Sequence, residues 1–226
     1  MKTICFIPAR GGSKRLPRKN LLPLAGRPLI AYTIEAARKS GIFDRIVVSS
    51  DDEEILEVAA REGAEADRRP PALGGDAVRF TEVLGEFLPR AGEEIETVAV
   101  LLPTCPFRTE QDIAAAYAML RGAGAPSFVV SVREYEFPPE FALEMNGTRL
   151  RVLRPEVYAA TTQSQSVGKS YHPNGAIYFG PVRRFLKERS FFREPLLGYV
   201  MPPERSLDID NPYQFEIAEA MMRARK

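Results

Sequence analysis

Positive charge and backbone freedom are concentrated near the start of the chain, in the stretch "PARGGSKRLPRKN" at residues 8–20. Two adjacent glycines, Gly11 and Gly12, let a backbone adopt φ > 0 and approach a ligand without a Cβ in the way. Successive N–H groups in such a turn form an anion-binding nest. Arg10 adds a planar fork and Lys14 a point charge, a pairing that suits phosphate oxygens. The stretch therefore predicts a loop that binds a polyphosphate.

The same loop differs from two well-known phosphate-binding motifs. A Walker A loop requires G-x-x-x-x-G-K-[ST], whereas this stretch reads G-G-S-K. A dinucleotide-binding fingerprint requires a helix that begins at once, and Pro17 and Pro23 prevent that helix. What remains is a long loop of glycines and cations that wraps a polyphosphate. The alternative, which the spacing leaves open, is a solvated basic turn or a nucleic-acid-binding patch.

Two carboxylates lie close together near the other end of the chain, in "SLDIDNP". Asp208 and Asp210 are two residues apart, so in an extended segment both side chains point the same way. Two convergent carboxylates suit Mg²⁺, which usually completes its shell with waters and substrate phosphates. The alternative is helix capping, because Asp210 or Asn211 before Pro212 makes a good helix N-terminus. A polyphosphate loop in the same chain favours the metal.

Short apolar runs alternate with helix-period segments over the first 132 residues. Pro28 and Gly41 mark the ends of the first helix, and Thr109 and Asp112 open the last one with capping-box spacing. The alternation predicts an α/β fold, a Rossmann-like and mostly parallel sheet with helices on both faces. Ligands of such sheets bind beyond the carboxyl ends of the strands, where the basic loop follows the first strand. We expect strands at residues 3–7, 45–50, 97–102 and 127–132, and helices at 28–41, 52–63, 79–88 and 109–120.

The pattern changes after residue 132. "FALEMNGTRLRVL" predicts two strands around an Asn146-Gly147 turn, a strong hairpin signal. The apolar runs "FPPEFALEM" and "LRVL" exceed what a projecting hairpin hides alone, and exposed patches of that kind mark contact surfaces. We therefore expect residues 133–170 to form an arm that projects from a single domain and makes a homodimer. Strands at 176–180 and 197–201 and a helix at 212–225 should follow.

Composition limits the possible partners. The 226 residues are 45% hydrophobic, enough to bury one full core, and the net charge of +1 gives no global field for nucleic acid or an acidic membrane. No apolar run approaches the roughly 20 residues of a membrane span. Cys5 and Cys105 are too far apart in sequence for a CxxC site or a disulfide framework, so we expect a cytoplasmic protein. His172 is the only histidine, which excludes triads with a spare base.

Three stretches together, "IPARGGSKRLPRKN", "HPNGAIYF" and "SLDIDNP", resemble the acylneuraminate cytidylyltransferase family, the CMP-sialic acid synthetases. With Arg69-Pro70 and the "LPT" of residues 102–104, the matches extend over nearly the whole chain. The resemblance implies transfer of CMP from CTP to a nine-carbon 2-keto acid sugar, with release of pyrophosphate. It also implies Mg²⁺ as cofactor and a cytoplasmic homodimer whose arm contributes to the partner's sugar site.

The resemblance also assigns roles to individual residues. Arg10 and Lys14 would act on the phosphates in catalysis, and Asp208 and Asp210 would hold the metal. The residues implied to bind the nucleotide are Ala9, Arg10, Gly11, Gly12, Ser13, Lys14, Asn20 and Arg69. Those implied to bind the sugar are Thr104, Lys169, Asn174, Tyr178, Phe191 and Phe192.

The sugar half departs from the sialic acid pattern at two places. Leu102 stands where sialic acid members commonly have Gln, and Gln163-Ser164-Gln165 lacks the arginine that commonly precedes its last Gln. The acceptor is then another nonulosonate, or its carboxylate is held by Lys169 or an arginine elsewhere. Two alternatives stay open. One is transfer to a different acidic sugar, such as a 3-deoxy octulosonate, and the other is a nucleotide-binding regulator without turnover.

Overall fold

The computed structural model describes residues 2–75, 77–92, 94–160 and 167–225. Within them, seven strands form one sheet in the order β11-β7-β10-β6-β1-β4-β5. β10 is antiparallel to both of its neighbours, and the other pairs are parallel. The predicted mostly parallel, Rossmann-like sheet is therefore confirmed. The strands are β1 Lys2–Pro8, β4 Arg45–Ser50, β5 Glu65–Arg68, β6 Ile95–Val100, β7 Phe128–Glu134, β10 Tyr171–Pro181 and β11 Leu196–Val200.

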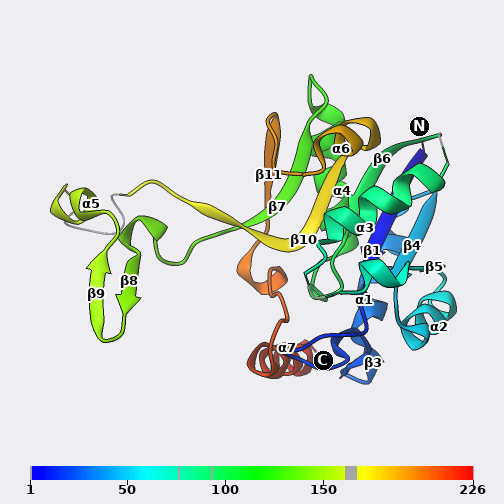
Figure 1. The fold of residues 1–226 in the computed structure, drawn as a ribbon, viewed down its shortest axis with the longest axis horizontal. Coiled ribbons are helices and arrows are strands. Elements are labelled where there is room, and N and C mark those ends of the chain that lie inside the picture. The colour runs from blue at the N-terminus through cyan, green and yellow to red at the C-terminus, as the bar shows by residue number, and fades with distance from the viewer. Residues whose placement is uncertain (1, 76, 93, 161–166, 226) are drawn as a thin grey trace.

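Helices cover both faces of this sheet (Figure 1). Side chains of β1 alternate between the faces. Cys5 and Ile7 belong to the core cluster under α1, α2 and α4, whereas Ile4 and Phe6 belong to the cluster under α3 and α6. The central strand is thus buried on both sides, which explains its unbroken apolar sequence. The helices are α1 Leu29–Ser40, α2 Glu53–Arg61, α3 Phe80–Phe87, α4 Glu110–Gly122 and α6 Val182–Glu188.

The helix ends follow the local signals in the sequence. α1 has Pro28 as its N-cap, and it ends at Gly41, whose φ of 66° is in the left-handed region. The capping box of α4 is present between Thr109 and Asp112. α7 Pro212–Ala224 is capped by Asn211, which exchanges bonds with Gln214. The capping side chain is therefore that of Asn211, while Asp210 contributes its backbone N–H, which donates to Gln214 Oε1 at 2.7 Å.

Short elements complete the fold. No helix in the described part of the chain is long and apolar enough to cross a membrane. The small ribbon after the basic loop pairs β2 Pro23–Leu24 with β3 Arg27–Pro28. The 3₁₀ turns are η1 Lys19–Leu21, η2 Pro71–Leu73, η3 Leu88–Arg90, η4 Pro139–Phe141 and η6 Pro203–Arg205.

A hairpin arm projects away from the sheet between the ends of β7 and β10 (Figure 1). The two strands stay paired as far as Tyr171 opposite Glu134, and the arm begins beyond them. It contains β8 Leu143–Asn146, β9 Arg149–Val152 and α5 Pro155–Ala160. The expected turn at Asn146-Gly147 is one residue too early. Asn146 still pairs with Arg149, so the turn residues are Gly147 and Thr148, and Gly147 supplies the positive φ of 61°.

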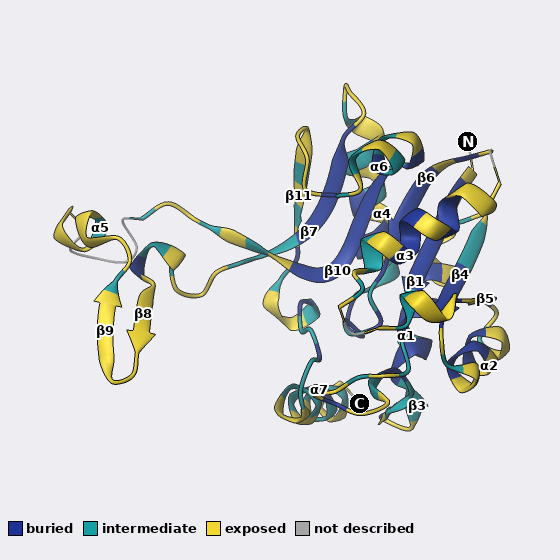
Figure 2. Cartoon of the chain, in the orientation of Figure 1, coloured by how far each residue is buried: buried dark blue, intermediate teal, exposed yellow. Residues whose placement is uncertain are grey.

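Much of the arm is exposed (Figure 2). Met145 and Leu150 lie directly opposite each other on the hairpin, with 68% and 58% of their surfaces exposed. Phe137 is 62% exposed. A small aromatic cluster forms inside the arm, where Phe141 packs edge-on against Tyr158 at 5.0 Å between ring centroids. The hairpin therefore leaves an apolar face uncovered.

Candidate active site

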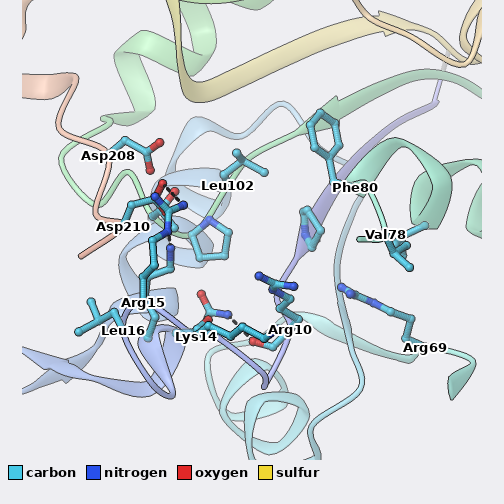
Figure 3. A pocket seen from close by; sticks show the side chains of 17 residues that line it. Arg10, Lys14, Arg15, Leu16, Arg69, Val78, Phe80, Leu102, Asp208 and Asp210 are labelled. Atoms are coloured by element: carbon cyan, nitrogen blue, oxygen red, sulfur yellow. Dashed lines mark hydrogen bonds and ion pairs between the residues drawn. The ribbon is translucent and has the colours of Figure 1, made fainter. Parts of the chain in front are cut away.

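A cavity of about 300 Å³ opens at the carboxyl ends of β1, β5 and β6. It is lined by residues of the basic loop after β1, by Arg69 after β5 and by the loop of residues 102–104 after β6. The segment before α7 closes it with Asp208 and Asp210 (Figure 3). Two stretches nearly 200 residues apart in sequence thus face the same space, at the edge of the sheet where a ligand is expected.

The two glycines of the basic loop act differently from the prediction. Neither Gly11 nor Gly12 has a positive φ. A Cβ at Gly11 would lie 2.6 Å from Asp52 Oδ2, so glycine is needed there for a close approach to Asp52. The Gly11 N–H donates to Asp51 Oδ1 at 3.0 Å. Because Asp51 uses this donor, the predicted nest is wrong in that respect, and the loop's side chains are left to bind an anion.

Buried contacts fix the shape of the basic loop. Asn20 is buried, lines the cavity and donates from Nδ2 to the Arg10 carbonyl at 2.9 Å. Leu16 is buried in a cluster that also contains Ile209. These contacts hold both ends of the loop, so that Arg10, Ser13 and Lys14 line the cavity. Figure 3 shows the Arg10 guanidinium pointing into it.

Arg69 brings a second guanidinium to the same wall. Its side chain is buried, and Nη2 donates to the Ser49 carbonyl at 2.7 Å. Burial lowers the pKa of Arg69, partly offset by the charges of Asp51 and Asp67, and the nearby Arg10 lowers it further. Its Nε has no hydrogen-bond partner among the described residues. The positive charges of Arg10 and Arg69 repel each other at the cavity wall, and an anionic ligand bound between them would relieve that repulsion.

The two aspartates are held at the cavity by the residue between them. Ile209 is fully buried, and its N–H donates to the Thr104 carbonyl at 2.8 Å. Asp210 accepts bonds from Arg15 at 2.9 Å and from Lys19 at 2.7 Å. Burial raises the pKa of Asp210, but these two cations outweigh it and hold the pKa below its usual value. Asp210 therefore remains charged and joined to the basic loop.

Asp208 has a different environment. Burial raises its pKa, only partly opposed by Thr104, and the charge of Asp210 raises it further. Asp208 Oδ1 is buried without a hydrogen-bond partner among the described residues. A buried, unpartnered carboxylate oxygen is costly, and a bound cation removes that cost. The residues present thus fit a divalent cation held by Asp208, with Asp210 beside it.

The type of metal site follows from the number of ligands. Within the described residues, no group of three or more His, Cys, Asp or Glu side chains could hold a metal ion by itself. Mg²⁺ commonly binds through one or two carboxylates and takes its remaining ligands from waters and substrate phosphates. A pair of aspartates opposite a cationic phosphate loop matches that requirement.

Arg108 is a buried cation beneath the cavity that the sequence reasoning missed. It is 3% exposed and donates to the Leu102 carbonyl at 3.3 Å, the Ala176 carbonyl at 2.8 Å and Thr33 Oγ1 at 2.7 Å. Burial lowers the pKa of Arg108. Its hydrogen bonds join the loop after β6 to the bulge of β10, the part between Pro173 and Tyr178 where the register against β7 shifts. Gly175 in this bulge has a φ of 77°, and a Cβ there would lie 3.4 Å from Asp208 Oδ2.

Among the residues that the resemblance implies to bind the sugar, Thr104 lines the cavity and the others do not. Tyr178 is buried, burial raises its pKa, and its ring packs against Phe80 at 5.2 Å. Phe80 itself lines the cavity. Phe191 is 1% exposed and lies in the core, whereas Phe192 is 50% exposed. Tyr178 and Phe191 therefore pack against Phe80 and do not line the cavity themselves.

The other sequence-predicted residues lie outside the cavity wall. Asn174 is buried and bonds Ser131, Ser206 and the Ala176 N–H through its own side chain. Ala9 is buried in the core. Lys169 pairs with Glu134 at the end of β7 at 2.9 Å and does not line its own chain's cavity. Gln163-Ser164-Gln165 lies outside the described residues.

Several cavity residues had no predicted role. Arg15 and Lys19 were recognised only as part of the local charge, and their contacts with Asp210 join segments far apart in sequence. Phe80 falls in the helix expected at residues 79–88, where an apolar residue usually packs in the core, and no role was predicted for Val78 just before it. Their position at the cavity depends on where α3 lies against the sheet.

Comparison with known proteins identifies the family. A family model described as "Cytidylyltransferase" matches residues 4–221. The chain belongs to this cytidylyltransferase family. A pseudaminic acid cytidylyltransferase from Campylobacter jejuni strain 81-176 is 37% identical over 99% of this chain and 97% of that protein. An N-acylneuraminate cytidylyltransferase from Escherichia coli O18:K1:H7 is 35% identical over 96% of this chain but 51% of its own, longer chain.

A solved structure has a similar fold to this cytidylyltransferase. A CMP:2-keto-3-deoxy-manno-octonic acid synthetase, solved in complex with CTP, superposes with a TM-score of 0.74 over 100% of both chains. The two sequences are 19% identical, so the similarity supports the fold alone. The predicted family and fold are both confirmed.

Proposed function

We propose that this cytidylyltransferase transfers CMP from CTP to the anomeric hydroxyl of a nine-carbon 2-keto acid sugar, a nonulosonate of the sialic acid type. Pyrophosphate is the second product. The observation that carries the proposal is that the cationic loop after β1 and the two aspartates before α7 line the same cavity. Arg10 and Lys14 line it on one side and Asp208 on the other, and one buried oxygen of Asp208 has no hydrogen-bond partner among the described residues. The full-length similarity to a pseudaminic acid cytidylyltransferase supports a nonulosonate as acceptor.

The proposed reaction exchanges one bond to phosphorus for another. The anomeric oxygen of the sugar bonds to the α-phosphorus of CTP, and the bond from that phosphorus to the bridging oxygen of the β-phosphate breaks. Pyrophosphate leaves with that oxygen, and the sugar hydroxyl loses its proton. Such transfers depend on positioning and charge stabilisation more than on covalent catalysis. Arg10, Lys14 and Arg69 supply cationic donors to the phosphate oxygens, and Asn20 holds Arg10 through its carbonyl.

Asp208 and Asp210 are the residues that would hold Mg²⁺. The metal, when bound, neutralises charge on the transferring phosphate and helps to orient the attacking oxygen. Asp210 also holds Arg15 and Lys19, and so fixes the basic loop relative to Asp208. Ile209 fixes both aspartates through its burial and its hydrogen bond to Thr104.

The functional unit in this proposal is a cytoplasmic homodimer joined through the arm. The exposed apolar side chains of the hairpin, Met145 and Leu150 among them, support a contact with a second copy of the chain. Lys169 on the arm is then a candidate for binding the sugar carboxylate in the partner's cavity. Its present partner is the exposed Glu134, a contact that costs little to exchange.

The experiment is a pyrophosphate-release screen of CTP, ATP, GTP and UTP, each with several nonulosonates and with a 3-deoxy octulosonate. We expect release only with CTP and a nonulosonate, and only with Mg²⁺ or a similar cation. Release with the octulosonate instead would identify a different acidic sugar as acceptor. Binding of CTP without release under any acceptor would make the chain a nucleotide-binding regulator.

A further inference from the structure

The segment that carries Asp208 and Asp210 runs from β11 at the sheet to α7 (Figure 1). Residues 206–210, all within the described part of the chain, belong to neither a helix nor a strand. Their side chains alternate in direction. Leu207 and Ile209 pack in the apolar cluster beside α7, whereas Asp208 and Asp210 line the cavity. The apolar residues therefore decide which way the two carboxylates point.

A metal site also requires the carboxylates to lie at the right place along the cavity. Each residue of an extended chain spans about 3.3 Å, whereas a bond from Mg²⁺ to an oxygen ligand is about 2.1 Å long. A slip of the segment by a single residue would therefore carry a carboxylate out of reach of the ion. Specific contacts must fix the segment along its own length.

An ion pair fixes the beginning of this segment. Arg205 donates from Nε to Asp112 Oδ2 at 3.0 Å and from Nη2 to Asp112 Oδ1 at 3.1 Å. Asp112 is 1% exposed and lies in the first turn of α4. Two parallel bonds between a planar guanidinium and a carboxylate define both distance and orientation, which a single bond does not. The contact therefore holds residue 205 in one position relative to α4.

Asp112 is itself held by two other elements. It accepts bonds from the N–H and Oγ1 of Thr109 at 3.0 Å and 2.9 Å, and from the hydroxyl of Tyr199 on β11 at 2.9 Å. A capping box requires only the contacts with Thr109. The bonds from Tyr199 and Arg205 are additional, and they join the start of α4 to the edge of the sheet and to the aspartate segment.

The other end of the segment is tied to the same short stretch of chain. The Ile209 N–H donates to the Thr104 carbonyl at 2.8 Å, and Thr104 lies eight residues before Asp112. Between the two ties, Ser206 Oγ donates to the Pro202 carbonyl at 2.9 Å. Residues 104–112 thus hold the segment on both sides of Asp208.

We propose that Arg205 and Asp112 are positioning residues for the metal site, whose ion pair fixes Asp208 along the cavity and so sets the affinity for the divalent cation. The inference rests on the proposed function, in which Asp208 and Asp210 hold Mg²⁺. Neither Arg205 nor Asp112 lines the cavity. Partners that orient metal ligands in this way change metal affinity by about 10- to 100-fold when they are replaced.

The test measures metal binding without turnover. Calorimetric titration with CTP, at a series of Mg²⁺ concentrations and without a sugar, gives the concentration of Mg²⁺ at which the tightening of CTP binding is half complete. We expect Arg205→Gln to raise this concentration about tenfold. The Kd for CTP without metal should stay unchanged, because Arg10 and Lys14 belong to a different loop.

Two further variants separate position from charge and from folding. Arg205→Lys keeps the charge but loses the planar fork, so the rise should be smaller. The double variant Asp112→Asn with Arg205→Gln leaves no buried carboxylate unpaired. It should melt at a higher temperature than Arg205→Gln alone and show the same rise in half-saturating Mg²⁺.

Arg45→Gln is the matched control. The side chains of Arg45 and Arg205 are 35% and 33% exposed. Arg45 donates to Glu65 from Nε at 2.9 Å and from Nη2 at 2.7 Å, and to the Ala91 carbonyl at 2.7 Å, and it does not line the cavity. This variant should lower the melting temperature and keep the half-saturating Mg²⁺ of the wild type.

The possible outcomes separate this inference from the proposed function. An unchanged half-saturating Mg²⁺ in the folded Arg205→Gln and double variants overturns the inference, and so does an equal rise in Arg45→Gln. CTP binding that no metal concentration tightens, even in the wild type, overturns it together with the proposed metal. Failure of the proposed CMP transfer is seen separately, as a wild-type protein that releases no pyrophosphate with CTP, Mg²⁺ and any nonulosonate.

Discussion

Asp208 and Asp210 are two residues apart and line one cavity, and Asp210 forms ion pairs with Arg15 at 2.9 Å and Lys19 at 2.7 Å. Asp208 keeps one buried oxygen without a partner among the described residues. Opposite environments move the two pKa values apart, that of Asp208 upward and that of Asp210 downward. Asp210 therefore organises the loop, and Asp208 is the better candidate for a direct metal ligand.

Asn substitutions at the two aspartates should have different effects on stability and the same effect on rate. Asp208→Asn removes a charge whose burial raises the pKa of Asp208, so the melting temperature should equal or exceed that of the wild type. Asp210→Asn loses two ion pairs and should melt slightly lower. Both should lose about a thousandfold or more in kcat with CTP still bound, because the charge that draws Mg²⁺ is reduced.

Calorimetry of CTP binding and pyrophosphate release with increasing Mg²⁺ or Mn²⁺ measure this prediction. Partial recovery at high metal concentration is expected if the damage is to metal affinity. Turnover close to that of the wild type in both variants, at ordinary Mg²⁺, would remove the metal from the mechanism.

Lys14→Ala should weaken CTP binding and leave the melting temperature nearly unchanged. Lys14 is exposed on a loop bounded by prolines and lines the cavity, so its charge serves the ligand more than the core. Calorimetric titration with CTP and a thermal melt of the apo protein measure the two effects. A variant that unfolds while CTP affinity is absent even in the wild type would make the loop a structural element.

Arg108 should position the cavity wall. Arg108→Lys keeps the charge but loses the planar fork that reaches Leu102, Ala176 and Thr33. We expect kcat to fall about 10- to 100-fold at a temperature where the protein is folded, since small displacements near reacting groups are costly. KM for CTP should change less.

A matched control is available for Arg108. Arg184 also donates to backbone carbonyls, those of Pro126 at 2.7 Å and Glu194 at 2.6 Å, but far from the cavity lining. Arg184→Lys should lower the melting temperature and keep kcat. If the two variants lose stability alike and both keep kcat, Arg108 serves only the fold.

Asp112→Asn should destabilise the protein in a pH-dependent way. Burial raises the pKa of Asp112, but bonds from Arg205, Thr109 and Tyr199 outweigh it and leave the pKa below its usual value. A lowered pKa contributes stability above the unfolded-state value of about 3.9, and that stability is lost as the pH falls through the native value. We expect a loss of about 1–3 kcal/mol at pH 7.

Urea denaturation of the wild type and Asp112→Asn between pH 7 and pH 3 measures the difference. It should be constant above about pH 5 and shrink below about pH 4. A difference that grows as the pH falls contradicts the assignment of the lowered pKa to Asp112.

The arm should make the dimer. Changing Met145 and Leu150 to Asp should give monomers, because the apolar face of the hairpin is exposed in a single chain. Val200→Asp is the control, since Val200 is 53% exposed on the edge strand β11 outside the arm. Light scattering at micromolar concentration measures the state. A monomeric wild type, or a dimer that survives the double change, contradicts the prediction.

Local signals in the sequence were enough to predict most of the elements. Pro28 and Gly41 mark the two ends of α1, and the capping box of Thr109 and Asp112 begins α4. Such signals can be recognised in the sequence because a helix cap depends on residues within one turn. The unbroken apolar strands indicated a sheet covered on both faces. The hairpin turn was predicted one residue too early, at Asn146-Gly147 instead of Gly147-Thr148. Gly147 is part of the turn in either strand register, so its presence in the sequence did not decide between them.

Contacts between distant segments were not predictable in this way. The close approach of Gly11 to Asp52, the bond from Arg108 to the Ala176 carbonyl and the shared burial of Leu16 and Ile209 join positions about 40 to almost 200 residues apart. Each depends on where the sheet places a loop, and no local pattern encodes that. Recognition of the two charged motifs nevertheless located both sides of the cavity.

The most direct test of CMP transfer is product analysis by mass spectrometry. The wild-type protein, CTP, Mg²⁺ and a nonulosonate are incubated, and the nucleotide products are identified. The proposal predicts a CMP ester of the sugar and pyrophosphate in equal amounts, with neither formed by Asp208→Asn. CTP left intact, or hydrolysed to free CMP or CDP with the sugar unchanged, would contradict it.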